Sequence, residues 1–288
     1  MDLSRREFLH LSAVNILLSS KRNSTPKVKK PLHNSRNSTK EELGVTKLCI
    51  VYNSGEVLLS ENEMRVRPPA SLVKLMLMYL ISMKVEKKEI FPTIAIKPQK
   101  TIFPTNNSDF VISAQSEYLL NDLLKAMAVI SSNTSAIAVA EALWGSVEKC
   151  VEEMNTTAKN LGMKSTRFET VNGYPVRPGF DVDRTTGRDM GIIAVECCKS
   201  PTILQWTSTK EFVIPGTNIV RKNTNDLLFE FYGCDGLKTG FTRSAGHCLI
   251  ATAKRANKRI ISVVMGAKTS RERFTIAKNL LEIGFADG

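Results

Sequence analysis

The sequence predicts one α/β domain, in which strands from both ends of the chain share a sheet and helices occupy the middle. Strand-like runs with turn residues lie near residue 50 and again after residue 234, and long apolar helical runs separate them. The chain has no internal repeat. With 288 residues and 42% hydrophobic composition, it is long enough for one sizeable core with a subdomain.

The first predicted elements are a hairpin and a helix. Residues 47–62, KLCIVYNSGEVLLSEN, predict two strands around a turn at Asn53-Ser54-Gly55. Two prolines, Pro68 and Pro69, then precede the apolar run SLVKLMLMYLISMKVEKK. Proline suits the start of a helix, so a helix is predicted over 71–88.

The middle of the chain is predicted to be mostly helical. A short strand and two helices that meet near 131–133 are expected over 110–145, and a further helix over 146–163. Residues 165–188 are rich in Gly and Pro and predict loops. The remaining predicted elements are a helix over 184–199, a hairpin over 211–223, three antiparallel strands over 234–267 and a closing helix over 270–285.

The net charge of +12 raises the question of an acidic partner. Residues 1–40 hold nine Lys and Arg against two acids, so this tail carries +7 and the rest of the chain only +5. The body has no basic run interleaved with aromatic residues. A nucleic-acid partner is therefore not predicted.

The six cysteines, at 49, 150, 197, 198, 234 and 248, contain no C-x-x-C pair, and the chain has only three histidines. Their spacing predicts neither a zinc site nor a disulfide framework. We interpret most of them as small buried hydrophobic residues and expect no metal.

The first 44 residues divide into two segments. Residues 1–20 combine Arg5-Arg6 with an apolar stretch from Phe8 to Leu18, which predicts an export signal or an N-terminal anchor. The paired arginines followed by Phe-Leu resemble a twin-arginine signal. The alternatives are a weak Sec signal and a frayed amphipathic helix. Residues 21–44 are polar and basic and predict a disordered linker, which leaves 45–288 as the folded domain.

Lys74 is the one charged residue near the start of the apolar helix, three residues after Ser71. Residues at this spacing share a helix face, and burial lowers the pKa of a lysine. A neutral Lys74 can accept the proton of Ser71 and make the serine a nucleophile. The alternative is a lysine that extends to the surface beside a helix-capping serine.

Two more short motifs carry polar side chains. Ser131 and Asn133 form S-x-N at a helix junction, where they can relay a proton and hold a substrate amide, or simply cap helices. Lys238, Thr239 and Gly240 are expected on an edge strand, where they suit a carboxylate and a closely approaching backbone. In this order and spacing, the three motifs are the serine/lysine signature of penicillin-recognising enzymes.

Over roughly residues 45–286, the chain resembles the low-molecular-mass penicillin-binding proteins, the serine D-Ala-D-Ala carboxypeptidases of the cell wall. The resemblance extends beyond the motifs to PPASLVKLM, LLKAMAVISSNTSAIAVAEAL, TTGRDM, NTNDLL and DGLKTGFTRSAGHCLIATAKR, in family order. It implies a β-lactamase/transpeptidase-like fold with a five-stranded antiparallel sheet flanked by helices and a mostly helical subdomain. Residues 45–288 would then be a penicillin-binding D,D-carboxypeptidase domain.

The resemblance also implies a role for each motif residue. Ser71 is the nucleophile that forms the acyl-enzyme, Lys74 is its general base, and Ser131 relays a proton. For substrate binding, the resemblance implies that Asn133 orients the peptide and that Gly240 lies beside the substrate backbone. The terminal carboxylate would be bound by Lys238, Thr239 and Arg273. The backbone N–H groups of Phe241 and Ser71 would form the oxyanion hole.

The implied partners are peptidoglycan muropeptides ending in D-Ala-D-Ala, with β-lactams as covalent inhibitors and no cofactor. The implied location is periplasmic or otherwise extracytoplasmic. Many family members continue into a β-rich domain and a C-terminal amphipathic helix that this sequence lacks, so an inner-membrane tether is expected only from the N-terminus. Ser132 stands where the family commonly has glycine, and Phe241 stands where histidine or tyrosine is frequent.

Four alternatives to this activity are open. A D,D-endopeptidase would use the same residues. A β-lactamase typically needs Glu in E-x-x-x-N, but Glu169 and Asn172 are one residue too close, so we interpret Glu169 as a loop residue. A Ser-His-Asp hydrolase is disfavoured because His247 is the only histidine of the body and G-x-S-x-G is absent. A non-catalytic peptidoglycan-binding scaffold would not need all the motif side chains.

Overall fold

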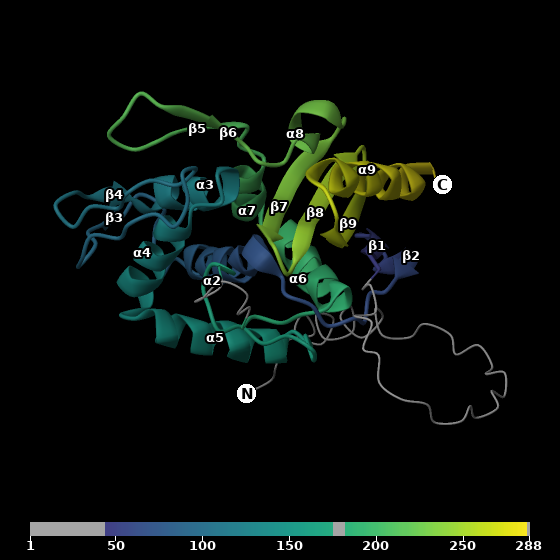
Figure 1. Ribbon diagram of the computed structural model, residues 1–288, viewed down its shortest axis with the longest axis horizontal. Coiled ribbons are helices and arrows are strands. Elements are labelled where there is room, and N and C mark those ends of the chain that lie inside the picture. The colour runs from purple at the N-terminus through teal and green to yellow at the C-terminus, as the bar shows by residue number, and fades with distance from the viewer. Residues whose placement is uncertain (1–43, 175–181, 287–288) are drawn as a thin grey trace, which may run out of the picture.

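The computed structural model describes residues 44–174 and 182–286 (Figure 1). The predicted export signal at 1–20 and almost all of the predicted linker at 21–44 lie outside these residues. In the part that is described, no helix is both long enough and apolar enough to cross a membrane.

The centre of the molecule is one five-stranded antiparallel sheet with the strand order β2-β1-β9-β8-β7. Its strands come from both ends of the described chain, as predicted. Their bounds are β1 Thr46–Val51, β2 Glu56–Glu61, β7 Cys234–Thr242, β8 Gly246–Arg255 and β9 Lys258–Ala267. β7 is an edge strand, which confirms the expected place of the Lys-Thr-Gly motif.

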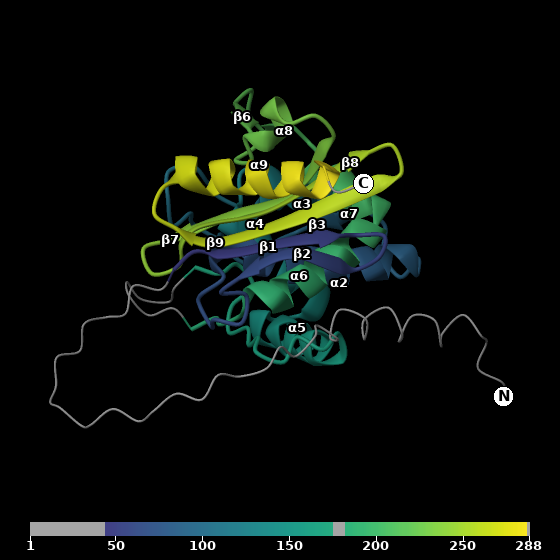
Figure 2. The ribbon, with the colours of Figure 1, turned by 90° about the vertical axis from the view of Figure 1, so that its right-hand side faces the viewer.

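Helices cover both faces of this sheet (Figure 2). The closing helix α9, Ser270–Ala286, packs on one face. On the other face lie α2, Lys74–Glu86, and α6, Gly187–Lys199. α2 is buried on nearly every side of its first half, because the sheet lies on one side of it and further helices on the other. The apolar run around Lys74 is therefore a central core helix.

The remaining helices form the subdomain beside the sheet and the connections to it (Figure 1). They are α3 Leu120–Val129, α4 Asn133–Trp144, α5 Val147–Asn160, α7 Pro201–Thr207 and α8 Leu227–Glu230. Two small two-stranded sheets complete the described chain, β3 Ala95–Ile96 with β4 Tyr118–Leu119, and β5 Glu211–Val213 with β6 Val220–Lys222.

The structure differs from the sequence prediction in detail. The helix expected from residue 71 begins with a 3-10 turn, η1 Ala70–Val73, before α2. The helices α7 and α8 were not predicted, since seven and four residues are too few to show a helical period. The interpretation of most cysteines as small buried residues is confirmed, because five of the six are buried.

Candidate active site

The first two motif residues lie where the 3-10 turn meets the core helix. Lys74 has no exposed surface. Its Nζ donates to Ser71 Oγ over 3.1 Å, to Asn133 Oδ1 over 2.7 Å and to the backbone oxygen of Asn172 over 2.9 Å. The amine is therefore held inside the molecule against the serine hydroxyl, and the alternative of a lysine that extends to the surface is wrong.

Burial sets the protonation of this amine. It lowers the pKa of Lys74 from 10.5 to about 7, although the negative charges of Asp109 and Asp183 act in the opposite direction. Near neutral pH a substantial fraction of the amine is therefore uncharged. An uncharged amine within hydrogen-bond distance of a hydroxyl can serve as its general base.

Close backbone packing fixes the turn that carries Ser71. Ala70 has a positive φ of 51°, which is unusual for a residue with a side chain. A Cβ on Gly173 would lie 1.8 Å from Ala70 O, and one on Gly240 would lie 3.1 Å from Ser71 N. The two glycines let a loop and the edge strand β7 press against the turn from two sides, and Ser71 itself stays half-buried.

The S-x-N motif lies at the junction of α3 and α4. Asn133 is the first residue of α4, and its amide oxygen accepts the hydrogen bond from Lys74. Ser131 has a positive φ of 60° and a buried Oγ that has no hydrogen-bond partner within 44–174 and 182–286. The structure thus brings Asn133 to the amine, while the proton relay through Ser131 stays a prediction.

The Lys-Thr-Gly motif adds a second buried amine. Lys238 is 1% exposed, and its Nζ donates to Thr239 O over 2.9 Å. Burial lowers the pKa of Lys238 well below its ordinary value, and the positive charges of Lys74 and Arg273 lower it further. Nη1 of Arg273 donates to Gly240 O over 3.3 Å, and burial lowers the pKa of this guanidinium too. Three buried cationic side chains therefore share one region, which suits an anionic ligand.

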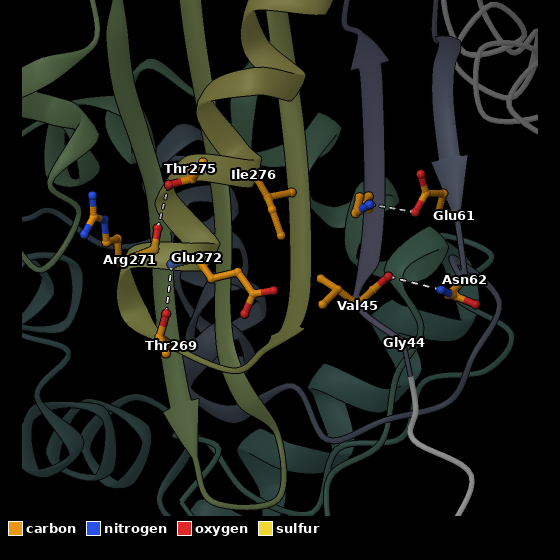
Figure 3. Close-up of a pocket in the computed structure, with 10 residues that line it drawn as sticks. Gly44, Val45, Glu61, Asn62, Thr269, Arg271, Glu272, Thr275 and Ile276 are labelled. Carbon is orange, nitrogen blue, oxygen red and sulfur yellow. Dashed lines mark hydrogen bonds and ion pairs between the residues drawn. The ribbon is translucent and has the colours of Figure 1, made fainter.

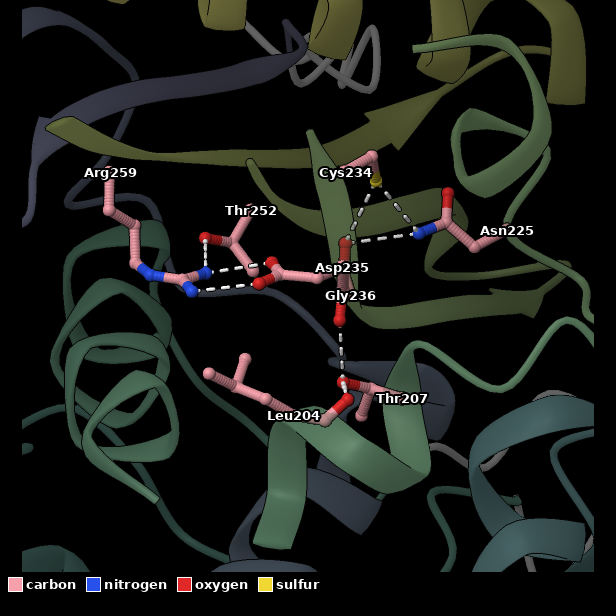
Figure 4. A network of polar contacts seen from close by, with 8 residues as sticks. All are labelled: Leu204, Thr207, Asn225, Cys234, Asp235, Gly236, Thr252 and Arg259. Carbon is pink, nitrogen blue, oxygen red and sulfur yellow. Dashed lines mark hydrogen bonds and ion pairs between the residues drawn. The ribbon is translucent and has the colours of Figure 1, made fainter. Parts of the chain in front are cut away.

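The start of β7 is fixed by a polar network (Figure 4). Both Nη atoms of Arg259 donate to the Asp235 carboxylate over 2.7 Å, and Nη1 also donates to Thr252 Oγ1 over 2.9 Å. From the other side, Asn225 Nδ2 donates to Gly236 O over 3.1 Å. Because the network precedes the Lys-Thr-Gly motif directly, it sets the position of that motif along the edge of the sheet.

Four residues of the site were not predicted from the sequence. Thr224 pairs its hydroxyl with that of Thr239 over 2.6 Å, and only its place in the family-like segment NTNDLL drew attention to it. Asn172 contributes a backbone oxygen, which no residue type reveals. Asp109 and Asp183 act on Lys74 through their charge from distant parts of the sequence, which only the fold brings together.

The residues that suggested other hydrolases have other environments. His247 stacks on Phe241 with ring centroids 4.3 Å apart, whereas the hydroxyl of Ser71 is bonded to Lys74, so no Ser-His-Asp triad forms around Ser71. Glu169 is exposed and pairs with Arg167, which agrees with its interpretation as a loop residue.

Two further observations concern ligands. Within the described residues, no group of three His, Cys, Asp or Glu side chains is arranged to hold a metal ion. A surface pocket of about 640 Å³ lies between the start of β1, the end of β2 and the start of α9 (Figure 3). None of the predicted site residues lines it.

Comparison with known proteins agrees with this geometry. The family model for D-alanyl-D-alanine carboxypeptidases matches residues 36–269. D-alanyl-D-alanine carboxypeptidase DacF of Bacillus subtilis is 33% identical over 243 residues, which are 83% of this chain and 61% of DacF. DacC of Escherichia coli is 34% identical, covering 81% of this chain and 59% of DacC. The chain thus spans about three fifths of the length of these curated relatives.

A solved structure of similar extent is penicillin-binding protein D2 of Listeria monocytogenes in its ampicillin-bound form. It superposes with a TM-score of 0.72 at 32% identity, over 83% of this chain and 96% of that one. This similarity confirms the predicted fold class. The family match covers most of the chain, and the chain therefore belongs to the D-alanyl-D-alanine carboxypeptidase family of low-molecular-mass penicillin-binding proteins.

Proposed function

We propose that this protein is a serine D,D-carboxypeptidase that removes the terminal D-Ala from peptidoglycan stem peptides through an acyl-enzyme on Ser71. One observation supports this most strongly. The fully buried amine of Lys74 lies 3.1 Å from the hydroxyl of Ser71, and its pKa of about 7 leaves it partly uncharged at neutral pH.

The reaction has two stages. Ser71 Oγ attacks the carbonyl carbon of the penultimate D-Ala and gives its proton to Lys74 Nζ, while the backbone N–H groups of Ser71 and Phe241 bind the oxyanion. The C–N bond then breaks, and the leaving amine takes this proton from Lys74 through Ser131. In the second stage water attacks the ester and gives a proton to Lys74, the bond to Ser71 Oγ breaks, and Ser71 takes that proton back.

The buried basic side chains would explain why the enzyme selects the C-terminal end of a substrate peptide. A terminal D-Ala carries a free carboxylate, whereas among the described residues the hydrogen bonds of Lys238 and Arg273 go to backbone oxygens. A carboxylate beside Lys238 and the Thr239 hydroxyl gains a charge-assisted hydrogen bond and relieves the repulsion among the cations. We assign the orientation of the peptide amide to Asn133, and its hydrogen bonds to Lys74 and to the Thr105 hydroxyl, which hold the side chain in one position, support this role.

The same site is proposed to bind β-lactams covalently. The Listeria relative was solved in ampicillin- and cefotaxime-bound forms. A β-lactam presents a reactive carbonyl and a carboxylate, and so matches Ser71 and the cations together. Action outside the cytoplasm, where peptidoglycan peptides occur, is proposed with it and agrees with the signal-like residues 1–20.

Mass spectrometry of the protein after incubation with benzylpenicillin and with a D-Ala-D-Ala peptide tests the proposal. We expect a stable penicilloyl adduct on Ser71, release of one D-Ala, and loss of both in Ser71→Ala. Ser54→Ala, in the exposed turn between β1 and β2, is the matched control and should behave as wild type. An adduct retained in Ser71→Ala would disprove the assignment. Rapid turnover of the adduct would favour a β-lactamase, and cleavage of cross-linked dimers would favour an endopeptidase.

A further inference from the structure

Ser132, which stands where the family commonly has glycine, belongs to a network that the mechanism above does not use. Its hydroxyl caps α4 by accepting from Ser135 N over 3.0 Å. The same hydroxyl donates to the carboxylate of Asp109 over 2.6 Å. Asp109 comes from the loop before β4, 23 residues earlier in the chain. The middle residue of S-x-N thus connects the helix to a distant acid.

The Asp109 carboxylate holds the whole first turn of α4. Its Oδ2 accepts from Asn133 N over 2.7 Å and from Thr134 N over 3.1 Å, and its Oδ1 also accepts from Thr134 Oγ1 over 3.1 Å. A carboxylate at a helix N-terminus is favoured by the unpaired N–H groups and by the helix dipole. α5 has only a cap of the Ser132 kind, the hydroxyl of its preceding residue Ser146, whereas α4 has the Asp109 carboxylate in addition to Ser132.

The same loop also holds the Asn133 side chain. Asn133 Nδ2 donates to Thr105 Oγ1 over 3.1 Å, which directs the amide oxygen to Lys74 Nζ at 2.7 Å. The backbone and the side chain of Asn133 are therefore both fixed by residues 105–109. Any shift of this loop moves the group that holds the amine in place beside Ser71.

We propose that Asp109 and Ser132 are positioning residues for acylation, which hold Asn133 and through it the Lys74 amine against Ser71. This inference rests on the proposed function, since it assigns a role within the same acylation step. Asp109 and Ser132 touch neither Ser71 nor the predicted carboxylate-binding residues, and they act through the first turn of α4.

The charge of Asp109 gives the proposal a distinctive signature. Lys74 is faced by two acids, Asp109 and Asp183, and by the cation of Lys238. Asp109 raises the pKa of Lys74 against the larger effect of burial. Removing the charge of Asp109 should lower the pKa of Lys74, so the amine becomes neutral at a lower pH. The acid limb of the acylation rate should therefore also move to lower pH.

The test measures the second-order rate of labelling by a fluorescent penicillin between pH 5 and 9. The variants are Asp109→Asn, Ser132→Ala and their double mutant. The control is Asp189→Asn, because Asp189 is a buried acid in α6 that accepts from Ser165 N over 2.8 Å and from Thr166 Oγ1 over 2.7 Å. Urea unfolding of each variant measures its loss of stability.

We expect Asp109→Asn to lower the plateau rate by roughly 10- to 100-fold, as small misplacements of reacting groups do. Its acid limb should move to lower pH. Adding Ser132→Ala to Asp109→Asn should then have little further effect, since both substitutions act on the same hydrogen bond between Ser132 and Asp109. Asp189→Asn should lose stability without either change in labelling. If Asp109→Asn fails to fold, Thr105→Val on the exposed loop should still slow labelling several-fold.

The outcomes separate this inference from the proposed function. A wild-type protein that penicillin does not label would overturn the proposed function and this inference with it. A labelled wild type overturns only the inference if Asp109→Asn, or Thr105→Val in its place, reacts at the wild-type rate. Independent, additive effects of Asp109→Asn and Ser132→Ala would likewise overturn it.

Discussion

Replacing Lys74 by methionine separates the chemical role of this residue from its effect on stability. Methionine keeps the length and the apolar stem of the side chain and removes the amine. Without the amine, the Ser71 hydroxyl loses its proposed base, so penicillin labelling should fall by about 10²- to 10⁴-fold. Lys84→Met, near the exposed end of the same helix, is the control and should be labelled like the wild type.

The magnitude for stability follows from the pKa of Lys74. The pKa is about 7 in the folded protein, against the ordinary value of 10.5. At pH 6 the amine is charged in both states, and holding this charge in the buried site destabilises the folded protein by roughly 5 kcal/mol relative to the unfolded chain. At pH 9 the unfolded chain still binds this proton and the folded protein has lost it, so roughly 2 kcal/mol of the cost remains. Stability due to Lys74 therefore rises with pH, and it does so between about pH 7 and 10.5.

The methionine variant loses this dependence on pH. It also leaves the oxygens of Asn133 and Asn172 without their donor, at about 1–3 kcal/mol each, but that cost is the same at every pH. The role of the Lys74 charge is therefore tested by how the free energy of unfolding changes with pH in the two proteins. From pH 6 to 9, the free energy of unfolding of the wild type should rise by about 2–3 kcal/mol more than that of the variant.

Urea unfolding of both proteins at pH 6 and 9, together with the labelling rate, checks this reasoning. Wild-type labelling of Lys74→Met would refute the role as a base. A difference between the two pH profiles below about 1 kcal/mol would refute the lowered pKa of Lys74, since it would mean that the amine is charged in the folded protein.

Three further predictions concern recognition, folding and export. Lys238→Gln should lower kcat/KM by roughly one to two decades for a peptide with a free terminal carboxylate and much less for its amide, because a charge-assisted hydrogen bond is worth about 1.5–3 kcal/mol. Equal losses for the two substrates would mean that Lys238 does not bind the carboxylate. Asp235→Ala removes the carboxylate that pairs with the buried guanidinium of Arg259 and should destabilise the protein by about 3–5 kcal/mol, measured by urea unfolding. A loss below about 1 kcal/mol would mean that water hydrates the guanidinium in the variant. Changing Arg5 and Arg6 to Lys should stop export of the full chain if the twin-arginine route is used, and undiminished export would favour Sec.

The sequence predicted the sheet and its edge strand well, because both depend on local patterns. Short apolar runs separated by turns at 53–55, 242–245 and 256–258 favour antiparallel neighbours. The place of Lys238 on β7 follows directly. The short helix α7 has no such pattern, although Ser200 and Pro201 do supply a helix start.

The site was predictable only in part, for a physical reason. Ser71 and Lys74 share a helix turn, so their contact follows from spacing alone. The acids that act on Lys74 are 35 and 109 residues further along the chain, and their approach depends on tertiary packing. The Asn172 contact uses a backbone oxygen, and nothing in the side chain marks it.

Burying three basic side chains side by side is costly for the folded protein, and this cost agrees with the proposed use of the site. Lys74, Lys238 and Arg273 are 0%, 1% and 8% exposed, and burial lowers the pKa of all three. Three basic groups are costly to gather in a packed core, since the charged form of each is stabilised by water or by an anion. An anion that binds only the folded form repays such a cost by mass action, about 2.7 kcal/mol at a concentration of 100 Kd. On the proposed function, a substrate carboxylate would therefore complete the electrostatics of the site as well as occupy it, and a substrate without that carboxylate would leave the repulsion between Lys238 and Arg273 in place.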